Sequence, residues 1–161
     1  MKILNQLDKN SPSNIIIFFI IISLMIRSIL LIKTYQNPDI LYIGDQSEYL
    51  NFLNIFNNGL SYGLDFGTKR MPIYPSFIYF LSNLSENPLF VSLVQHLIGL
   101  SSIIIAYKIG KLFSDQVALL SSFFSCINFN FIIYGNFILT ESIFIPIILL
   151  VFYFFLKFII E

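Results

Sequence analysis

Residues 137–160 read FILTESIFIPIILLVFYFFLKFII, and residues 15–32 read IIIFFIIISLMIRSILLI. At ~1.5 Å per helical residue, runs of this length suit a hydrocarbon layer of ~30 Å. Two further apolar runs lie between them, at Leu89–Ile109 and Val117–Tyr134. Apolar and polar residues do not alternate strictly in these runs, as they would in a transmembrane strand. The sequence therefore predicts an all-α, polytopic transmembrane bundle of four spans that forms a single membrane domain.

The composition also indicates a membrane protein. Of the 161 residues, 57% are hydrophobic and 11% are charged, whereas soluble domains average about 45–50% apolar and about 25% charged residues. The net charge is zero, so no overall field favours nucleic acid, and we expect no nucleic-acid partner. The one cysteine, Cys126, excludes a disulfide within the chain and a cysteine-based metal site.

The short loops predict the orientation, because Lys and Arg collect on the cytoplasmic side of a membrane. With four spans, five lysines fall on one side, namely Lys2, Lys9, Lys108, Lys111 and Lys157. This pattern predicts a cytoplasmic N-terminus and an extracytoplasmic loop at Lys33–Pro88. No small-residue cleavage site follows the first run, so we expect an uncleaved signal anchor in a bacterial-type cytoplasmic (inner) membrane. Arg27, near the end of that run, is expected to reach the interface with its long side chain.

The loop at Lys33–Pro88 is long enough to need structure of its own. Its first half carries a capping-box pattern, DQSE at 45–48, followed by apolar residues at helical spacing and a stop signal at 57–59. In its second half, Pro75 suits the first turn of a helix that continues to Leu84. We therefore predict two interfacial helices in this loop, on either side of a glycine-rich turn.

Four short stretches carry a resemblance to a known family. They are GDQSEY at 44–49, RMPIYP at 70–75, LFSDQVALL at 112–120 and LTES at 139–142. Their order and spacing resemble the opening of GT-C membrane glycosyltransferases, above all the bacterial protein-mannosyltransferase-like and aminoarabinose-transferase-like branch. The resemblance runs from about Arg27 to the C-terminus. Because family members typically have more spans, it implies that this chain corresponds to the N-terminal part of a larger module, with the remainder as a partner.

The resemblance implies an enzyme that uses a sugar linked to polyprenyl phosphate at the outer membrane face. A carboxylate in the first outer loop would deprotonate the acceptor hydroxyl of a glycan, lipid or protein, and the anomeric configuration would invert. The matching carboxylate is Asp45. Such a base is needed because an alcohol is a poor nucleophile until a base takes its proton. The guanidinium of Arg70 suits the leaving phosphate, and Tyr74 can bond the phosphate or stack on the sugar. Further candidates for the cavity are Glu48, Lys69, His96, Asn136 and Glu141.

The loop residues also have structural explanations. Asp45 and Glu48 fit the two halves of a capping box, so Asp45 can serve as cap and base together. Lys69 and Arg70 can anchor a helix at the lipid headgroups, and Tyr74 can belong to the interfacial belt of aromatic residues.

The candidates near or within the spans have structural explanations too. Glu141 meets the favourable dipole at the start of a helix. Gln95 and His96 suit interhelical hydrogen bonds, and Asn136 can bond to neighbouring helices in the same way. No spacing of His, Asp and Glu compels a metal site. Some GT-C relatives use a divalent ion and others do not, so metal dependence stays open.

The alternative function is a non-catalytic or transport-type membrane component of glycan assembly. A transporter is expected to show internal repeats and discontinuous spans with polar residues at the membrane midplane. The sequence shows no convincing repeat, and its polar residues collect toward the outer face. The pattern therefore favours the glycosyltransferase.

Overall fold

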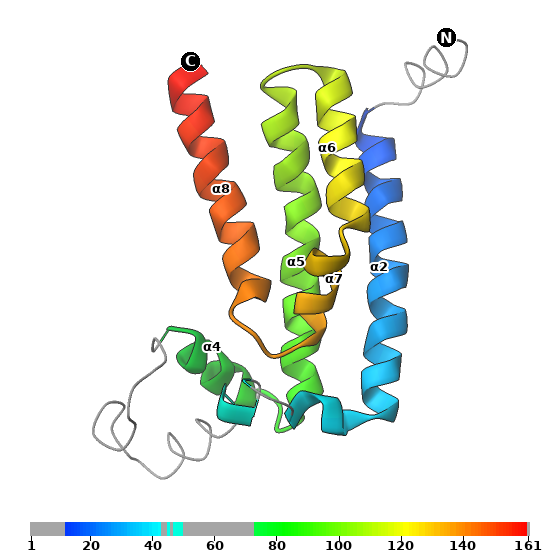
Figure 1. Cartoon of the computed structure of the whole chain (residues 1–161), viewed down its shortest axis with the longest axis vertical. Coiled ribbons are helices and arrows are strands. Elements are labelled where there is room, and N and C mark those ends of the chain that lie inside the picture. The colour runs from blue at the N-terminus through cyan, green and yellow to red at the C-terminus, as the bar shows by residue number, and fades with distance from the viewer. Residues whose placement is uncertain (1–11, 43–44, 46, 50–72, 161) are drawn as a thin grey trace.

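The computed structural model describes residues 12–42, 45, 47–49 and 73–160 (Figure 1). The elements are α2 (Pro12–Gln36), the 3-10 helix η1 (Pro38–Tyr42), α4 (Ile73–Ser82), α5 (Pro88–Lys111), α6 (Asp115–Ile127), α7 (Phe129–Asn136) and α8 (Glu141–Ile160). These residues contain no strand. The predicted all-α class is therefore confirmed.

Three helical stretches have the length and apolar composition of membrane spans: Asn14–Gln36, Pro88–Lys111 and Glu141–Ile160. The bent pair of α6 and α7 is a candidate for a fourth. In the 18-residue apolar segment of each helix, only 11% of the residues of α2 and 6% of those of α8 are buried inside the protein, against 44% for α5. Since most of the surface of α2 and α8 is apolar and exposed, the chain has the character of an integral membrane protein.

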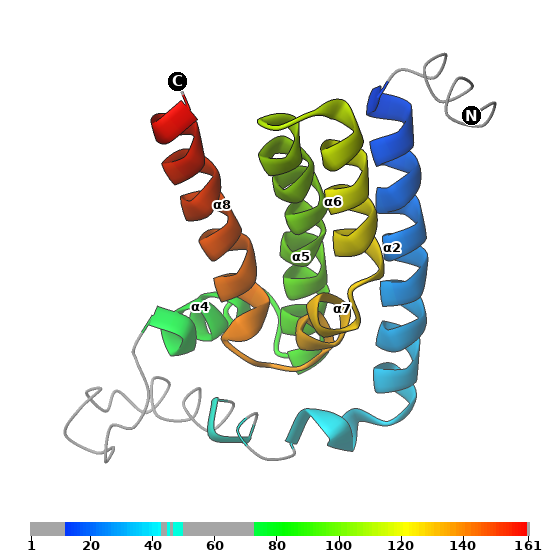
Figure 2. The same cartoon turned by 45° about the horizontal axis from the view of Figure 1, so that its top comes forward.

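The helix α5 lies at the centre of the bundle, with α8 on one side and α6 and α2 on the other (Figures 1 and 2). In the view of Figure 1, the chain runs down α2, up α5, down α6 and α7, and up α8. The start of α2, the α5–α6 turn and the end of α8 therefore share one end of the bundle. η1, α4 and the α7–α8 link share the other. We call the second one the loop end, because both ends of the 33–88 stretch lie there.

The helices α5 and α6 pack through small residues. On the buried side of α5, Ser102, Ala106 and Gly110 recur at every fourth position, as do Ala118 and Ser122 on α6. This spacing lets two helix backbones approach closely in a membrane. A Cβ atom on Gly110 would lie 2.5 Å from the Cα atom of Ala118. The contact therefore leaves no room for a side chain at this position of α5.

The third apolar run, predicted as a span at 117–134, consists of two helices. α6 ends at Ile127, and α7 begins at Phe129 after a bend of 43°. Between them, Asn128 has ψ 110°, and its side chain accepts a hydrogen bond from the amide of Phe131 at 3.1 Å. Asparagine favours such N-cap positions because its short side chain bonds nearby backbone amides. The run thus contains a capped break that hydropathy alone does not reveal.

The fourth predicted span also begins later than expected. Phe137 has ψ 148°, which is extended backbone, and α8 starts only at Glu141. Within this link the amide of Leu139 bonds the carbonyl of Phe137 at 2.9 Å. Residues 137–140 therefore form a turn at the loop end.

Candidate functional site

An apolar cluster closes the loop end of the bundle. Its members come from η1, from the stretch 45–49, from α4, from the start of α5 and from the α7–α8 link. The buried members are Leu41, Tyr49, Tyr74, Ile78, Leu81, Val91 and Ile138. The first five belong to the two halves of the 33–88 stretch, so burial of apolar surface holds both halves against the bundle.

Tyr74 is the polar centre of this cluster. Its ring meets the ring of Tyr49 edge-on, with centroids 4.8 Å apart and planes at 84°. Its hydroxyl donates to Oε1 of Gln95 at 2.5 Å. Burial, and then the neighbouring Tyr49, raise the pKa of the Tyr74 phenol, so the hydroxyl stays protonated and acts as a donor. A phosphate bound to Tyr74, as the sequence predicts, would have to displace Gln95 from this hydroxyl.

Three acidic residues predicted from the sequence lie in segments at the same end of the bundle as this cluster. Asp45 and Glu48 are exposed and, like Tyr49, have helical backbone. The predicted cap at Asp45 stays a prediction, because the residues on either side of it lie outside the described ones. Glu141 is the exposed first residue of α8, and its carboxylate accepts a hydrogen bond from Oγ1 of Thr140 at 3.1 Å. Carboxylates from two distant parts of the sequence therefore lie at the loop end.

The basic half of the predicted site falls elsewhere in the chain. Lys69 and Arg70 lie outside the described residues, as does the glycine-rich turn that precedes them. In the sequence, Arg70 comes three positions before Ile73, the first residue of α4. The pairing of the Asp45 carboxylate with the Arg70 guanidinium stays a prediction.

A second polar group lies inside the bundle, around Arg27. Its Nη1 donates to Nδ1 of His96 at 3.1 Å, and its Nη2 donates to the carbonyl of Phe131 at 2.9 Å. Its Nε donates to Oγ of Ser23 at 3.3 Å. Because a guanidinium only donates, Nδ1 of His96 is the acceptor, and the neutral ring carries its proton on Nε2. The pair joins α2, α5 and α7.

The side chain of Arg27 does not extend to the membrane interface, so that prediction is wrong. The side chain is only 1% exposed, and α2 continues to Gln36, about two and a half turns beyond it. Charged groups within spans usually face the bundle interior, where they find polar partners. In the described part of the chain, no carboxylate pairs with Arg27. Its partners are neutral.

Two glycines make room for this arginine–histidine pair. A Cβ atom on Gly99 of α5 would lie 2.8 Å from Nη1 of Arg27. One on Gly135 of α7 would lie 2.7 Å from Nδ1 of His96. The backbones of α5 and α7 therefore approach the charged group so closely that an added methyl would displace it.

Side chains from α2 and α5 hold the end of α7. Thr34 and Asn136 exchange hydrogen bonds of 3.0 and 2.8 Å. Oγ of Ser92 donates to the carbonyl of Asn136 at 3.0 Å, and Nε2 of Gln95 donates to the carbonyl of Phe137 at 2.6 Å. Carbonyl groups at a helix end need such donors when no water reaches them. Asn136, predicted as a cavity residue, is buried among these helices.

No protein-family model, curated protein or solved structure matches the chain. The GT-C resemblance therefore rests on the sequence motifs at 44–49, 70–75, 112–120 and 139–142. Among the residues that the structure describes, no group of three or more His, Cys, Asp or Glu side chains could hold a metal ion.

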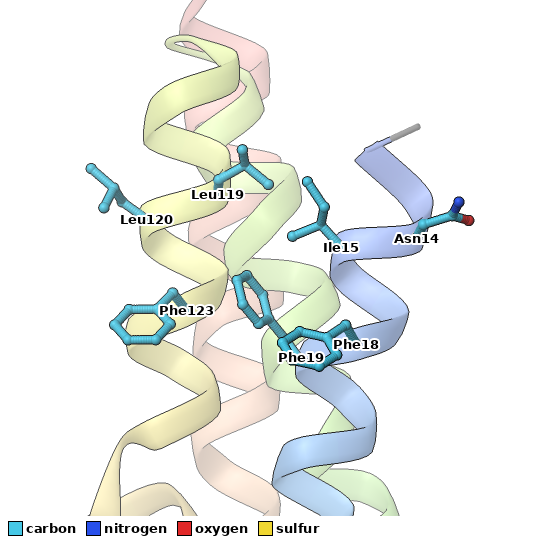
Figure 3. Close-up of a pocket in the computed structure, with 7 residues that line it drawn as sticks. All are labelled: Asn14, Ile15, Phe18, Phe19, Leu119, Leu120 and Phe123. Carbon is cyan, nitrogen blue, oxygen red and sulfur yellow. The ribbon is translucent and has the colours of Figure 1, made fainter. Parts of the chain in front are cut away.

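Apolar grooves open on the outside of the described helices. One, of about 500 Å³, lies between α2 and α6, where the ring centroids of Phe19 and Phe123 are 5.7 Å apart (Figure 3). Asn14, on its rim, points away from α6. Another groove, of about 420 Å³, is lined by Tyr35 near the end of α2 and by Asn87 before α5. The second groove lies at the loop end, where α2 ends and α5 begins.

Proposed function

We propose that this chain is a GT-C-type glycosyltransferase module that moves a sugar from polyprenyl phosphate to an acceptor hydroxyl at the outer membrane face. The observation that carries the proposal is the packing of Tyr49 on Tyr74. This contact holds the stretch that contains Asp45 against the end of an apolar bundle, close to Glu141. A lipid donor presents its head group at such an edge, so a general base is useful there. The motifs that resemble the family supply these residues.

The proposed reaction is a single displacement. The carboxylate of Asp45 takes the proton of the acceptor hydroxyl. The acceptor oxygen then forms a bond to the anomeric carbon while the bond from that carbon to the phosphate oxygen breaks. The electron pair leaves with polyprenyl phosphate, whose growing negative charge Arg70 stabilises. Attack opposite to the leaving group inverts the anomeric configuration.

The proposal includes a topology. It has four spans, the third made of α6 and α7, two interfacial helices in the first outer loop, and a cytoplasmic N-terminus in a bacterial-type inner membrane. An interfacial α4 is supported by its place at the loop end and by Ile73 and Phe80, which are 82% and 63% exposed on an apolar helix. Lys108 and Lys111, at the opposite end of the bundle, support a cytoplasmic side there.

The test of the proposed function is Asp45→Asn in the full chain, reconstituted in vesicles with polyprenyl-phosphate hexoses and pentoses and with alcohol acceptors. The measurement is the release of polyprenyl phosphate. We expect turnover to fall about 100-fold or more, since a general base contributes ~10²–10⁴-fold. The matched control is Asp39→Asn, which changes an exposed acid of η1 near the same end and is expected to keep normal turnover. Full transfer by Asp45→Asn would refute the assignment of the base.

A transport-type component is the second candidate. It is favoured by the broken pair α6–α7 and by the buried Arg27–His96 pair, because discontinuous helices and charges at depth mark transport pathways. The same vesicles separate the two functions. Movement of a labelled lipid-linked sugar across the bilayer, without release of polyprenyl phosphate and without any effect of Asp45→Asn, would favour transport.

A further inference from the structure

Gln95 connects three segments of the protein through one side chain. It lies in α5 and is 0% exposed. Its Oε1 accepts from the hydroxyl of Tyr74 in α4 at 2.5 Å. Its Nε2 donates to the carbonyl of Phe137 at 2.6 Å and to that of Gly135 at 3.4 Å. The side chain therefore lies between the outer-loop helix α4 and the α7–α8 link.

The two ends of this amide have fixed partners. Backbone carbonyls only accept, so the nitrogen of Gln95 must face Phe137 and its oxygen must face Tyr74. The protonated phenol of Tyr74 supplies the one donor that this oxygen needs. Tyr74 and Gln95 are both buried, so the bond between the hydroxyl and the amide oxygen lies away from water.

Tyr74 extends this restraint to the proposed site. It is the second residue of α4, and its ring packs edge-on against Tyr49. Asp45 comes one helical turn before Tyr49, and Arg70 comes four positions before Tyr74. Both residues of the proposed chemistry are thus joined to the Tyr49–Tyr74 contact by short segments of chain.

We infer that Gln95 is a positioning residue: through Tyr74 it holds α4 and the Asp45 stretch in a fixed mutual arrangement. The inference rests on the proposed glycosyltransferase function. A displacement of about 1 Å in a reacting group can lower a rate by up to ~10²-fold. Loss of the Tyr74–Gln95 bond is therefore expected to lower turnover more than donor affinity, because in this structure the hydroxyl of Tyr74 bonds Gln95 and not a donor phosphate.

The test compares two variants in the vesicle assay described above. Tyr74→Phe keeps the ring contact and removes the hydroxyl, and Gln95→Leu removes the amide. We expect each to lower kcat by about 10- to 100-fold, with KM for the polyprenyl-phosphate sugar changed by less than about threefold. The double variant is expected to be no slower than Gln95→Leu alone, because both changes break the same link.

Ser92→Ala is the matched control. Ser92 is also buried in α5, and its hydroxyl bonds the carbonyl of Asn136, so the variant loses a buried hydrogen bond near the same link but none to α4. We expect Ser92→Ala to keep normal kcat. A second measurement is independent of turnover: spin labels at Glu48→Cys and Glu141→Cys report the spread of their mutual distance. That spread should broaden in Tyr74→Phe and stay unchanged in Ser92→Ala.

The outcomes separate the inference from the function on which it rests. If Asp45→Asn is inactive while Tyr74→Phe keeps normal kcat and a narrow label distance, the positioning role is refuted and the proposed function stands. If Ser92→Ala slows turnover as much as Tyr74→Phe, the effect is a general loss of stability, and the positioning role is again refuted. A fully active Asp45→Asn would overturn the proposed function and the positioning role together.

Discussion

At the scale of single residues, Arg27 illustrates how an apolar bundle holds a charge. The sequence marks it as a polar break in an apolar run, but its partners, His96 and Phe131, lie 69 and 104 positions away. No short-range pattern reports such a contact, which is why the sequence predicted an interfacial arginine. Inserting a charged residue at the centre of a lone span costs ~2.5–3.5 kcal/mol. Bundle formation adds hydrogen bonds, and these favour the folded state.

We therefore expect Arg27→Met to lower the free energy of unfolding by about 1–3 kcal/mol, because Nδ1 of His96 and the carbonyl of Phe131 lose their donor. Titration of the folded chain with dodecyl sulfate in mixed micelles measures this change. The control is Ser28→Ala, an exposed position on the same helix, where we expect a change within about 0.5 kcal/mol. Equal stability of Arg27→Met and the parent protein would mean that these bonds contribute nothing.

At the scale of elements, apolar runs predicted where helices lie better than where they break. α2 and α5 match the runs at 15–32 and 89–109 to within four residues at each end. The break at Asn128 and the late start of α8 could not be predicted from hydropathy. They depend on the side chain of Asn128, which caps a backbone amide, and on Gln95 of α5, which donates a hydrogen bond to the carbonyl of Phe137. The small residues of α5 and α6 are visible in the sequence, but only the structure shows that they face each other in the contact between the two helices.

The close contact at Gly110 leads to a prediction for this helix pair. Gly110→Ala would place a methyl against the backbone of Ala118, and such overpacking typically lowers stability by about 1–3 kcal/mol. Ile104→Ala on the same helix is the control. Ile104 is an exposed residue of a candidate span, where side chains meet lipid instead of helix, so we expect little effect. Thermal unfolding in detergent compares the two, and a Gly110→Ala protein as stable as the parent would contradict the proposed packing.

At the scale of the whole molecule, the two halves of the 33–88 stretch return to one end of the bundle. The motifs named Asp45, Glu48 and Glu141 in advance. The position of the Asp45 stretch depends on the Tyr49–Tyr74 contact and on the bond from Tyr74 to Gln95, which join separate elements. The sequence therefore predicted which residues to consider, and the packing of Tyr49 on Tyr74 holds the stretch with Asp45 and Glu48 against α4. Lys69 and Arg70 remain predictions from the motif.

The arrangement predicts opposite accessibility for Asp39 and Gln116, which are exposed at opposite ends of the bundle. In intact cells, a membrane-impermeant maleimide should label Asp39→Cys, whereas Gln116→Cys should react only after permeabilisation. The native Cys126 gives little background because it is buried and donates to the carbonyl of Phe19. Labelling of both positions from the same side would contradict the proposed topology.

The partners of Arg27 also determine the order of events during synthesis. A ribosome adds about 5–20 residues per second, so the residues at positions 96 and 131 emerge roughly 3 to 20 seconds after Arg27. During that interval α2 holds a guanidinium in the bilayer. Of its hydrogen-bond partners, Ser23 is already synthesised, because it lies one turn earlier on the same helix. The isoleucines, leucines and phenylalanines of α2 must keep the helix inserted until α5 and α7 arrive. A nascent chain that loses several of them is expected to slip out of the translocation site before its later helices can bind the arginine.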